Sequence, residues 1–279
     1  MDRKINERIQ GFQTQDGAGV SLIRVLSNQT INEFDPILLL DSFDSTIPAE
    51  YAAGFPLHPH RGIETISLIV KGNMVHKDSL GNSDAISDGE VQWMTAGSGI
   101  QHEEQLPASD RMLGVQLWLN MPKKNKMSQP EYRSIKADEI EEIPFDGGIL
   151  RLVSGRYQDH QGHSGKYLPL DYYDIRMEPN QKFLIDTPED KSVMIFTLSG
   201  DAKIAGEIVK EKTAVKLTAG DSLKVESLNK KVILLFISSV KLEEPIAWGG
   251  PIVMNTRQEL ETAFSELRSG TFLKKKIDY

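Results

Sequence analysis

Short strands separated by turns dominate the first half of the chain and restrict its fold to the all-β class. Between Val20 and Asn120, runs of β-branched and apolar residues alternate with Gly- and Asp-containing turns such as Lys71-Gly72-Asn73 and Ser87-Asp88-Gly89. Regular spacing of this kind is typical of an antiparallel sandwich or barrel. The expected strands are Ser21–Leu26, Ile37–Ser42, Thr65–Val70, Glu90–Met94 and Val115–Asn120.

A weaker copy of this pattern follows in the second half. The run from Val193 to Gly200 is similar to the run from Thr65 to Gly72, and a later Gly220-Asp221 turn parallels the Asp-Gly turn of the first copy. A repeat of this size indicates two similar β domains in tandem. We therefore predict two β domains in tandem, each a sandwich or a barrel.

The segment between the two copies is mixed in charge and contains Pro144 and the Gly147-Gly148 pair, which is typical of a junction between domains. These features set the predicted boundaries. The predicted segments are a first barrel over 1–130, a linker over 131–148, a second barrel over 149–245 and a C-terminal segment over 246–279.

The C-terminal segment carries a helix signal. Thr256-Arg257-Gln258-Glu259 matches a capping box, in which the Thr hydroxyl and the Glu carboxylate each accept a main-chain amide at the start of a helix. Apolar residues then recur at helical spacing, and Gly270 ends the run. The sequence predicts one short amphipathic helix over 257–269.

Composition excludes several classes of protein. Forty acidic against thirty-two basic residues give a net charge of −8, without a long basic run, so no direct contact with nucleic acid is expected. No apolar run approaches the roughly 18 residues of a membrane-spanning helix. The charged opening is unlike a secretory signal, and the absence of cysteine fits a reducing compartment. A cytoplasmic protein that binds a small molecule is expected.

Two histidine couplets, His58-Pro59-His60 and His102-Glu103-Glu104, point to a metal site. Successive side chains of a strand alternate between its faces, so His58 and His60 share a face, as do His102 and Glu104. Borderline divalent metals prefer imidazole, and four such ligands leave one or two positions open for chemistry. A single strand histidine is more often a surface or hydrogen-bonded core residue, but two couplets in one domain favour a metal.

Two stretches around these couplets resemble the pirin family of the cupin superfamily. They run from Gly54 to Thr65 and from Gly89 to Glu104, and each matches without gaps. The resemblance continues through Gly114–Asn120 and, more weakly, at Gly249–Thr256. It is dense in the first half of the chain and sparse in the second.

The resemblance implies a bicupin, that is, two antiparallel, jelly-roll-like β-barrels in tandem, with a metal in the first barrel only. The family's four ligands fall on His58, His60, His102 and Glu104, the same four that strand parity selects. The family's ion is typically iron, Fe(2+), with other divalent transition metals as alternatives. No histidine follows His163, so the second barrel cannot build an imidazole-based centre of its own.

The resemblance also implies an activity. Several bacterial members are quercetin 2,3-dioxygenases, which open the flavonol heterocycle with dioxygen and release carbon monoxide. This chain would then bind a flavonol-like aromatic substrate and dioxygen, and Glu104 would accept the proton of the substrate 3-hydroxyl. The alternative is an iron-bearing regulatory protein whose metal state controls a protein partner, because both classes use the same ligands. A vestigial or isomerase-like cupin is a third reading.

Residues close to the couplets allow further expectations. Glu64 keeps the inward parity of His60 and is expected to accept hydrogen bonds near the site or to be an occasional ligand, and it is left out of the set of four ligands. His76 and Asp78 either form hydrogen bonds near the site or have a structural role on the barrel rim. Phe55, in a Gly-Pro loop, is expected to face the cavity, whereas core packing is the commoner fate of a residue such as Trp118.

Overall fold

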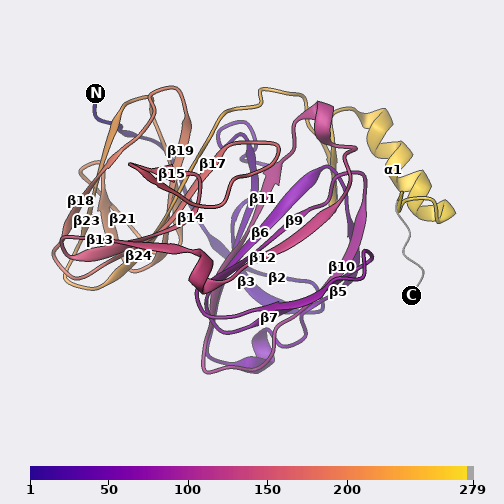
Figure 1. The fold of residues 1–279 in the computed structure, drawn as a ribbon, viewed down its shortest axis with the longest axis horizontal. Coiled ribbons are helices and arrows are strands. Elements are labelled where there is room, and N and C mark those ends of the chain that lie inside the picture. Colours follow the sequence, from indigo (N-terminus) through magenta and orange to yellow (C-terminus); the bar gives the residue numbers. More distant parts are fainter. Residues whose placement is uncertain (275–279) are drawn as a thin grey trace. The chain divides into compact units, whose positions relative to one another are not determined.

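The chain forms two compact all-β units. The structure, a computed structural model, describes residues 1–274 (Figure 1). One unit, here called the histidine unit, contains residues 13–24, 37–137 and the described chain from Leu242 onward. The other, here called the repeat unit, contains residues 1–12, 25–36 and 138–241. The predicted all-β class and the division into two domains are confirmed.

The histidine unit consists of two sheets with a common core. Side chains from both sheets, among them Leu22, Phe43, Ile69, Met74 and Ile86, pack into one buried cluster. The larger sheet has the order β12-β9-β6-β11-β4-β3-β2 and the smaller the order β5-β10-β7-β8. Its strands are β2 (Phe12–Asp16), β3 (Val20–Leu26), β4 (Ile37–Ser45), β5 (Phe55–His60), β6 (Ile63–Lys71), β7 (Met74–Asp78), β8 (Ser83–Ile86), β9 (Glu90–Thr95), β10 (Ile100–Gln105), β11 (Met112–Asn120) and β12 (Glu131–Ile135).

The repeat unit has the same two-sheet plan. A seven-stranded sheet has the order β1-β22-β19-β24-β17-β14-β13, and a four-stranded sheet has the order β18-β23-β20-β21. Strands β15 and β16 form a separate hairpin. The strands are β1 (Ile5–Gln10), β13 (Glu141–Phe145), β14 (Gly148–Ser154), β15 (Arg156–Tyr157), β16 (His160–Gln161), β17 (Leu170–Met177), β18 (Lys182–Asp186), β19 (Ser192–Ser199), β20 (Ala202–Ile204), β21 (Glu207–Val209), β22 (Thr213–Leu217), β23 (Ser222–Ser227) and β24 (Val232–Ser239).

The observed units differ from the predicted boundaries at two places. Strand β1 pairs with β22, with Ile5 opposite Leu217, although residues 1–130 were expected to form one barrel. The expected linker over 131–148 is also structured, because β12 pairs with β9 and β13 pairs with β14. Edge-strand pairing joins segments that are distant in sequence, and local composition carries no signal for it.

The C-terminal segment returns to the histidine unit as a hairpin, β25 (Ala247–Gly249) and β26 (Ile252–Met254), followed by helix α1 (Arg257–Ser269). The expected helix and its capping box are present: Glu259 N donates to Thr256 Oγ1 over 3.2 Å, and Gly270 ends the helix with φ of 70°. Ile252, Met254, Ala263 and Phe272 form its core. The last five residues of the expected 246–279 segment lie outside the described residues.

Three short 3-10 turns complete the described structure. They are Pro48–Glu50, Lys123–Asn125 and Ala137–Glu139.

Within residues 1–274, no helix has the length and the apolar character that crossing a membrane requires.

Candidate metal centre

The two histidine couplets lie on adjacent antiparallel strands. In the pairing of β10 with β5, His102 is directly opposite His58, and Ile100 is opposite His60. Directly opposite residues project from the same face of a sheet, so the register brings the couplets together. The prediction that both couplets share one barrel and one face therefore agrees with the strand register.

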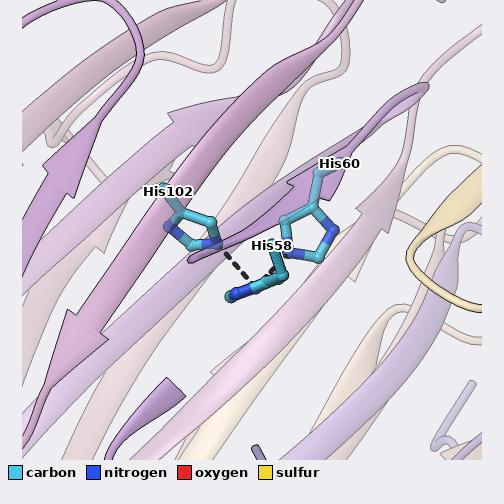
Figure 2. Close-up of side chains that lie close together, drawn as sticks. All are labelled: His58, His60 and His102. Carbon is cyan, nitrogen blue, oxygen red and sulfur yellow. Dashed lines mark hydrogen bonds between the residues drawn. The ribbon is translucent and has the colours of Figure 1, made fainter. Parts of the chain in front are cut away.

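The three imidazoles converge through their Nε2 atoms. His58 Nε2 lies 3.0 Å from His60 Nε2 and 3.0 Å from His102 Nε2. Figure 2 shows the three rings close together, with dashed lines for these two contacts. His60 and His102 are each 1% exposed, whereas His58 is partly exposed. The cluster is therefore buried on two sides and reachable at His58.

Hydrogen bonds at the opposite ring nitrogens define the tautomers of His58 and His60. His58 Nδ1 lies 2.7 Å from the carbonyl oxygen of Pro56, and His60 Nδ1 lies 3.1 Å from that of Pro251. A carbonyl oxygen only accepts, so both Nδ1 atoms carry the hydrogen and both Nε2 atoms carry lone pairs. Two such lone pairs 3.0 Å apart cannot form a hydrogen bond with each other, so the arrangement suits a cation bound by both nitrogens.

His102 has the same tautomer, set by a relay through His76. Asp78 Oδ2 lies 2.8 Å from His76 Nε2 and accepts its hydrogen. His76 Nδ1 is then an acceptor and lies 3.3 Å from His102 Nδ1, which donates to it. His102 Nε2 is thus left with a lone pair. His76 and Asp78 form the hydrogen bonds near the site that were one of the two expectations for them, and both are buried.

Burial keeps the central imidazoles neutral. Desolvation, followed by the proximity of His58, lowers the pKa of His60 to about 3. Desolvation is also the main reason that the pKa of His102 lies well below its usual value, with the neighbouring histidines adding to it. Neutral imidazole is the form that binds metals, so these rings need no deprotonation before an ion binds.

The donor spacing fits a divalent transition metal. Imidazole nitrogens bind such ions at about 2.1 Å, and two ligands at right angles are then separated by about 3.0 Å. The two printed Nε2 distances, 3.0 Å each, match this separation. The three histidines could therefore hold an ion with little movement.

Glu104 is buried beside the histidines and is held by two amides. Its carboxylate accepts hydrogen bonds from Gln116 Nε2 over 3.1 and 3.0 Å, and from Gln92 Nε2. The ligand atoms of Glu104, His76 and His102 all lie within 4.8 Å of one another. The potential ligand atoms thus form two sets that share His102. One set contains His58 and His60, and the other contains His76 and Glu104.

The sequence analysis did not identify Gln92, Gln116 or the Pro251 carbonyl. Gln92 is fully buried on β9 and Gln116 is 9% exposed on β11. A long polar amide inside an otherwise apolar strand was the available signal, because such a group is buried only with a partner. The role of Pro251 had no local signal, since its carbonyl comes from the far end of the chain.

The surrounding residues differ in part from expectation. Trp118, expected in the core, lies against His60 with ring centroids 5.0 Å apart and an interplanar angle of 83°. Phe55, expected to face the cavity, packs on a core cluster with its ring 6.1 Å from that of Phe43. Glu64 is buried and accepts a hydrogen bond from Thr95 Oγ1 over 2.6 Å. Trp118 therefore places an aromatic side chain of β11 beside the imidazole of His60.

Family models match both halves of the chain. A model described as Pirin matches residues 19–119, which include all three clustered histidines and Glu104. A second, described as the Pirin C-terminal cupin domain, matches residues 172–273. Together they cover more than half of the sequence.

Individual relatives align over nearly the full length. A pirin-like protein of Caulobacter vibrioides is 36% identical over 275 residues, covering 97% of this chain and 99% of the relative. Pirin of Homo sapiens is 32% identical and covers 96% of this chain and 93% of its own. The solved structure of a quercetin 2,3-dioxygenase from Acinetobacter baumannii is 30% identical, has a TM-score of 0.89, and covers 98% of this chain and 99% of that one. The chain belongs to the pirin family of the cupin superfamily.

Proposed function

We propose that this protein is a metal-dependent dioxygenase of the quercetinase type, which cleaves the heterocycle of a flavonol-like substrate with dioxygen. The observation that carries the proposal is the convergence of three imidazole Nε2 atoms, those of His58, His60 and His102, beside the buried carboxylate of Glu104. The similarity to a solved quercetin 2,3-dioxygenase over almost the whole chain supports the choice of reaction.

In this proposal His58, His60, His102 and Glu104 hold one iron(II) ion. A divalent ion supplies Lewis acidity and an open coordination position when it is bound there. The relay from Asp78 through His76 orients the His102 ring, and the Pro251 carbonyl orients His60. Such hydrogen bonds to the outer ring nitrogen fix the tautomer and increase the basicity of the ligand.

Glu104 is the proposed proton acceptor. The 3-hydroxyl of a flavonol would donate its proton to a Glu104 carboxylate oxygen as the substrate ring binds. Gln92 and Gln116 hold this carboxylate in one orientation, so it needs no reorganisation before the transfer. Trp118 presents an apolar indole against His60, a suitable surface for a flat aromatic ring and for the exclusion of water.

The proposal is tested by loading the full-length protein with iron(II) and measuring dioxygen uptake and carbon monoxide release with a panel of flavonols. The matched pair of variants is His102→Ala and His160→Ala, because His160 is a half-exposed histidine of the repeat unit paired with Glu141. We expect turnover by the wild type and by His160→Ala, and loss of both metal and turnover in His102→Ala.

Two outcomes contradict the proposal. Flavonol cleavage that persists in His102→Ala would remove the metal site from the reaction. Redox-dependent capture of a protein partner by the iron-loaded protein, without turnover of any flavonol, would favour the regulatory alternative. Metal analysis of the protein as purified identifies the ion independently of activity.

A further inference from the structure

The repeat unit contains a cavity of about 1120 Å³ that the proposed dioxygenase site does not use. All residues that line it belong to the repeat unit. They come from the β15–β16 hairpin, the chain between β16 and β17, strands β17 and β18, the segment after β18, and the start of β23 with the preceding Asp221. The interior of the unit itself is filled by apolar side chains from both sheets. The cavity therefore lies outside this core, at the surface that Tyr157 and Tyr173 form over it.

An aromatic series connects the core to the cavity. The Tyr173 ring stacks on Phe236 with centroids 4.8 Å apart at 8°, and the Tyr157 ring meets Tyr173 edge-on at 5.8 Å and 72°. Tyr157 is partly exposed and lines the cavity together with Tyr173. A planar ring in the cavity would extend this series by one member, with the offset or edge-on contacts that aromatic pairs prefer.

The wall that carries Arg156 is held in place by buried polar groups. The Tyr173 hydroxyl donates to the Arg156 carbonyl, and the Arg156 amide donates to Asp171 Oδ1 over 3.2 Å. Asp171, 8% exposed, also accepts from Lys191 Nζ over 2.8 Å. The main chain of Arg156 is therefore held from both sides at the edge of the cavity.

Two lining groups retain unused hydrogen-bonding capacity. Among residues 1–274, the Arg156 guanidinium contacts only the neutral Gln161, over 3.3 Å, and makes no ion pair. The Tyr157 hydroxyl likewise has no hydrogen-bond partner within that range. Two lysines also line the cavity: Lys191 is neutralised by Asp171, and Lys166 Nζ lies 5.5 Å from the centroid of the Tyr167 ring.

The charge of Asp186 limits the charge of the ligand. Asp186 lines the same cavity, and its carboxylate adds to the main effect of burial in raising the pKa of Tyr157. A ligand with one anionic group can place it at Arg156 and keep its ring near Tyr157, whereas a second anionic group would be repelled by Asp186. Of the other charged residues of the lining, Lys191 pairs with Asp171, Asp221 pairs with the N-terminal amine, and Lys166 lies over the Tyr167 ring. The guanidinium of Arg156 and the carboxylate of Asp186 then favour a monoanion.

We propose that this cavity binds a small aromatic monocarboxylate, with its ring against Tyr157 and its carboxylate paired with the Arg156 guanidinium. A planar guanidinium binds a carboxylate through two parallel hydrogen bonds, which gives directional recognition. The proposal concerns the repeat unit alone and holds whether or not the histidine site is a dioxygenase.

The test uses the full-length protein and isothermal titration calorimetry with 2-naphthoate. Three probes separate the contributions: 2-naphthol lacks the carboxylate, cyclohexanecarboxylate lacks the aromatic ring, and 2,6-naphthalenedicarboxylate adds a second charge. We expect 2-naphthoate to bind at one site, and each of the three others to bind about tenfold more weakly or worse. Equal affinity for 2-naphthol and 2-naphthoate, or absence of binding by 2-naphthoate, overturns the proposal.

Variants locate the site. Arg156→Ala should weaken 2-naphthoate binding about tenfold or more, and Tyr157→Leu should weaken it by a similar factor, whereas Arg257→Ala should leave it unchanged. Arg257 is the control because its side chain is 92% exposed on α1. His102→Ala should also bind 2-naphthoate as the wild type does. Loss of binding in His102→Ala, with Arg156→Ala unaffected, would place the ligand at the histidine site and refute the inference.

Discussion

His60 Nδ1 lies 3.1 Å from the main-chain oxygen of Pro251, which is 191 residues further along the chain. This bond directs the Nε2 lone pair of His60 towards His58 and His102. The orientation of one candidate ligand thus depends on the β25–β26 turn, an element that lies outside both histidine motifs. Residues that hold this turn should therefore affect metal affinity without contacting the ion.

Gly62 provides a test of this dependence. A Cβ at Gly62 would lie 2.0 Å from the carbonyl oxygen of Val253, whereas a Cβ at Gly250 would have no neighbour within 4 Å. Both glycines have positive φ, 77° and 53°. We expect Gly250→Ala to cost about 1 kcal/mol of unfolding free energy from the backbone alone. Gly62→Ala should cost about 3 kcal/mol and should weaken metal binding, because β26 must move.

Urea unfolding and metal titration of both variants check this prediction. Equal losses of stability in Gly62→Ala and Gly250→Ala would show that the approach of Val253 to Gly62 has no consequence. An unchanged metal affinity in a folded Gly62→Ala protein would show that the Pro251 contact does not orient His60.

The amide of Gln116 should contribute to metal affinity through Glu104. Gln116→Leu removes the donor that lies 3.1 and 3.0 Å from the two carboxylate oxygens and leaves the carboxylate held by Gln92 alone. Loss of such an outer hydrogen bond typically lowers metal affinity about 10-fold to 100-fold. Gln101→Leu is the matched control, because Gln101 precedes His102 on β10 and its side chain projects from the opposite face.

Competition titrations with a chelator of known affinity give the metal dissociation constants of both glutamine variants. The prediction is contradicted if Gln116→Leu and Gln101→Leu bind the metal equally well.

Metal removal should lower the stability of the wild-type protein. An ion that binds only the folded state adds about 2.7 kcal/mol when its free concentration is one hundred times the dissociation constant. We expect chelation to lower the melting temperature of the wild type and of His160→Ala, and to leave that of His58→Ala unchanged. Differential scanning fluorimetry with and without chelator is the measurement. A chelator effect of wild-type size in His58→Ala would exclude His58 from the ligand set.

Lys126 should make stability depend on pH. Its ammonium is buried and donates to the carbonyl oxygen of Gly62 over 2.7 Å, to Asn120 Oδ1 over 2.6 Å and to the carbonyl oxygen of Val253 over 3.1 Å. Burial nevertheless lowers the pKa of Lys126 to about 7, from an ordinary 10.5. Between these values the unfolded chain binds more protons than the folded one, so the unfolding free energy rises with pH.

The comparison of the wild type with Lys126→Met isolates this effect, because other titrating groups cancel in the difference. From pH 7 to pH 9 the unfolding free energy of the wild type should rise by about 2 kcal/mol relative to that of the variant. Urea denaturation at both pH values measures it. If the unfolding free energies of the wild type and of Lys126→Met change with pH in parallel, the pKa of Lys126 is the same in the folded and unfolded states, and the prediction is wrong.

Local chemistry determined a large part of this protein. Alternation along a strand was sufficient to place His58 with His60, and His102 with Glu104, and the Thr256 capping box with Gly270 fixed both ends of the helix. Turn residues and β-branched runs fixed the all-β class. These signals are readable because each depends on neighbours within a few residues.

Tertiary structure alone decided how these pieces meet. The pairing of β1 with β22, the amides that hold Glu104 and the Pro251 carbonyl on His60 all join segments separated by tens or hundreds of residues. Strand register and close approach set such contacts, and both arise from packing of the whole sheet rather than from local propensity. The sequence thus specified which residues could bind a metal, and the fold specified the tautomers and orientations in which they are held.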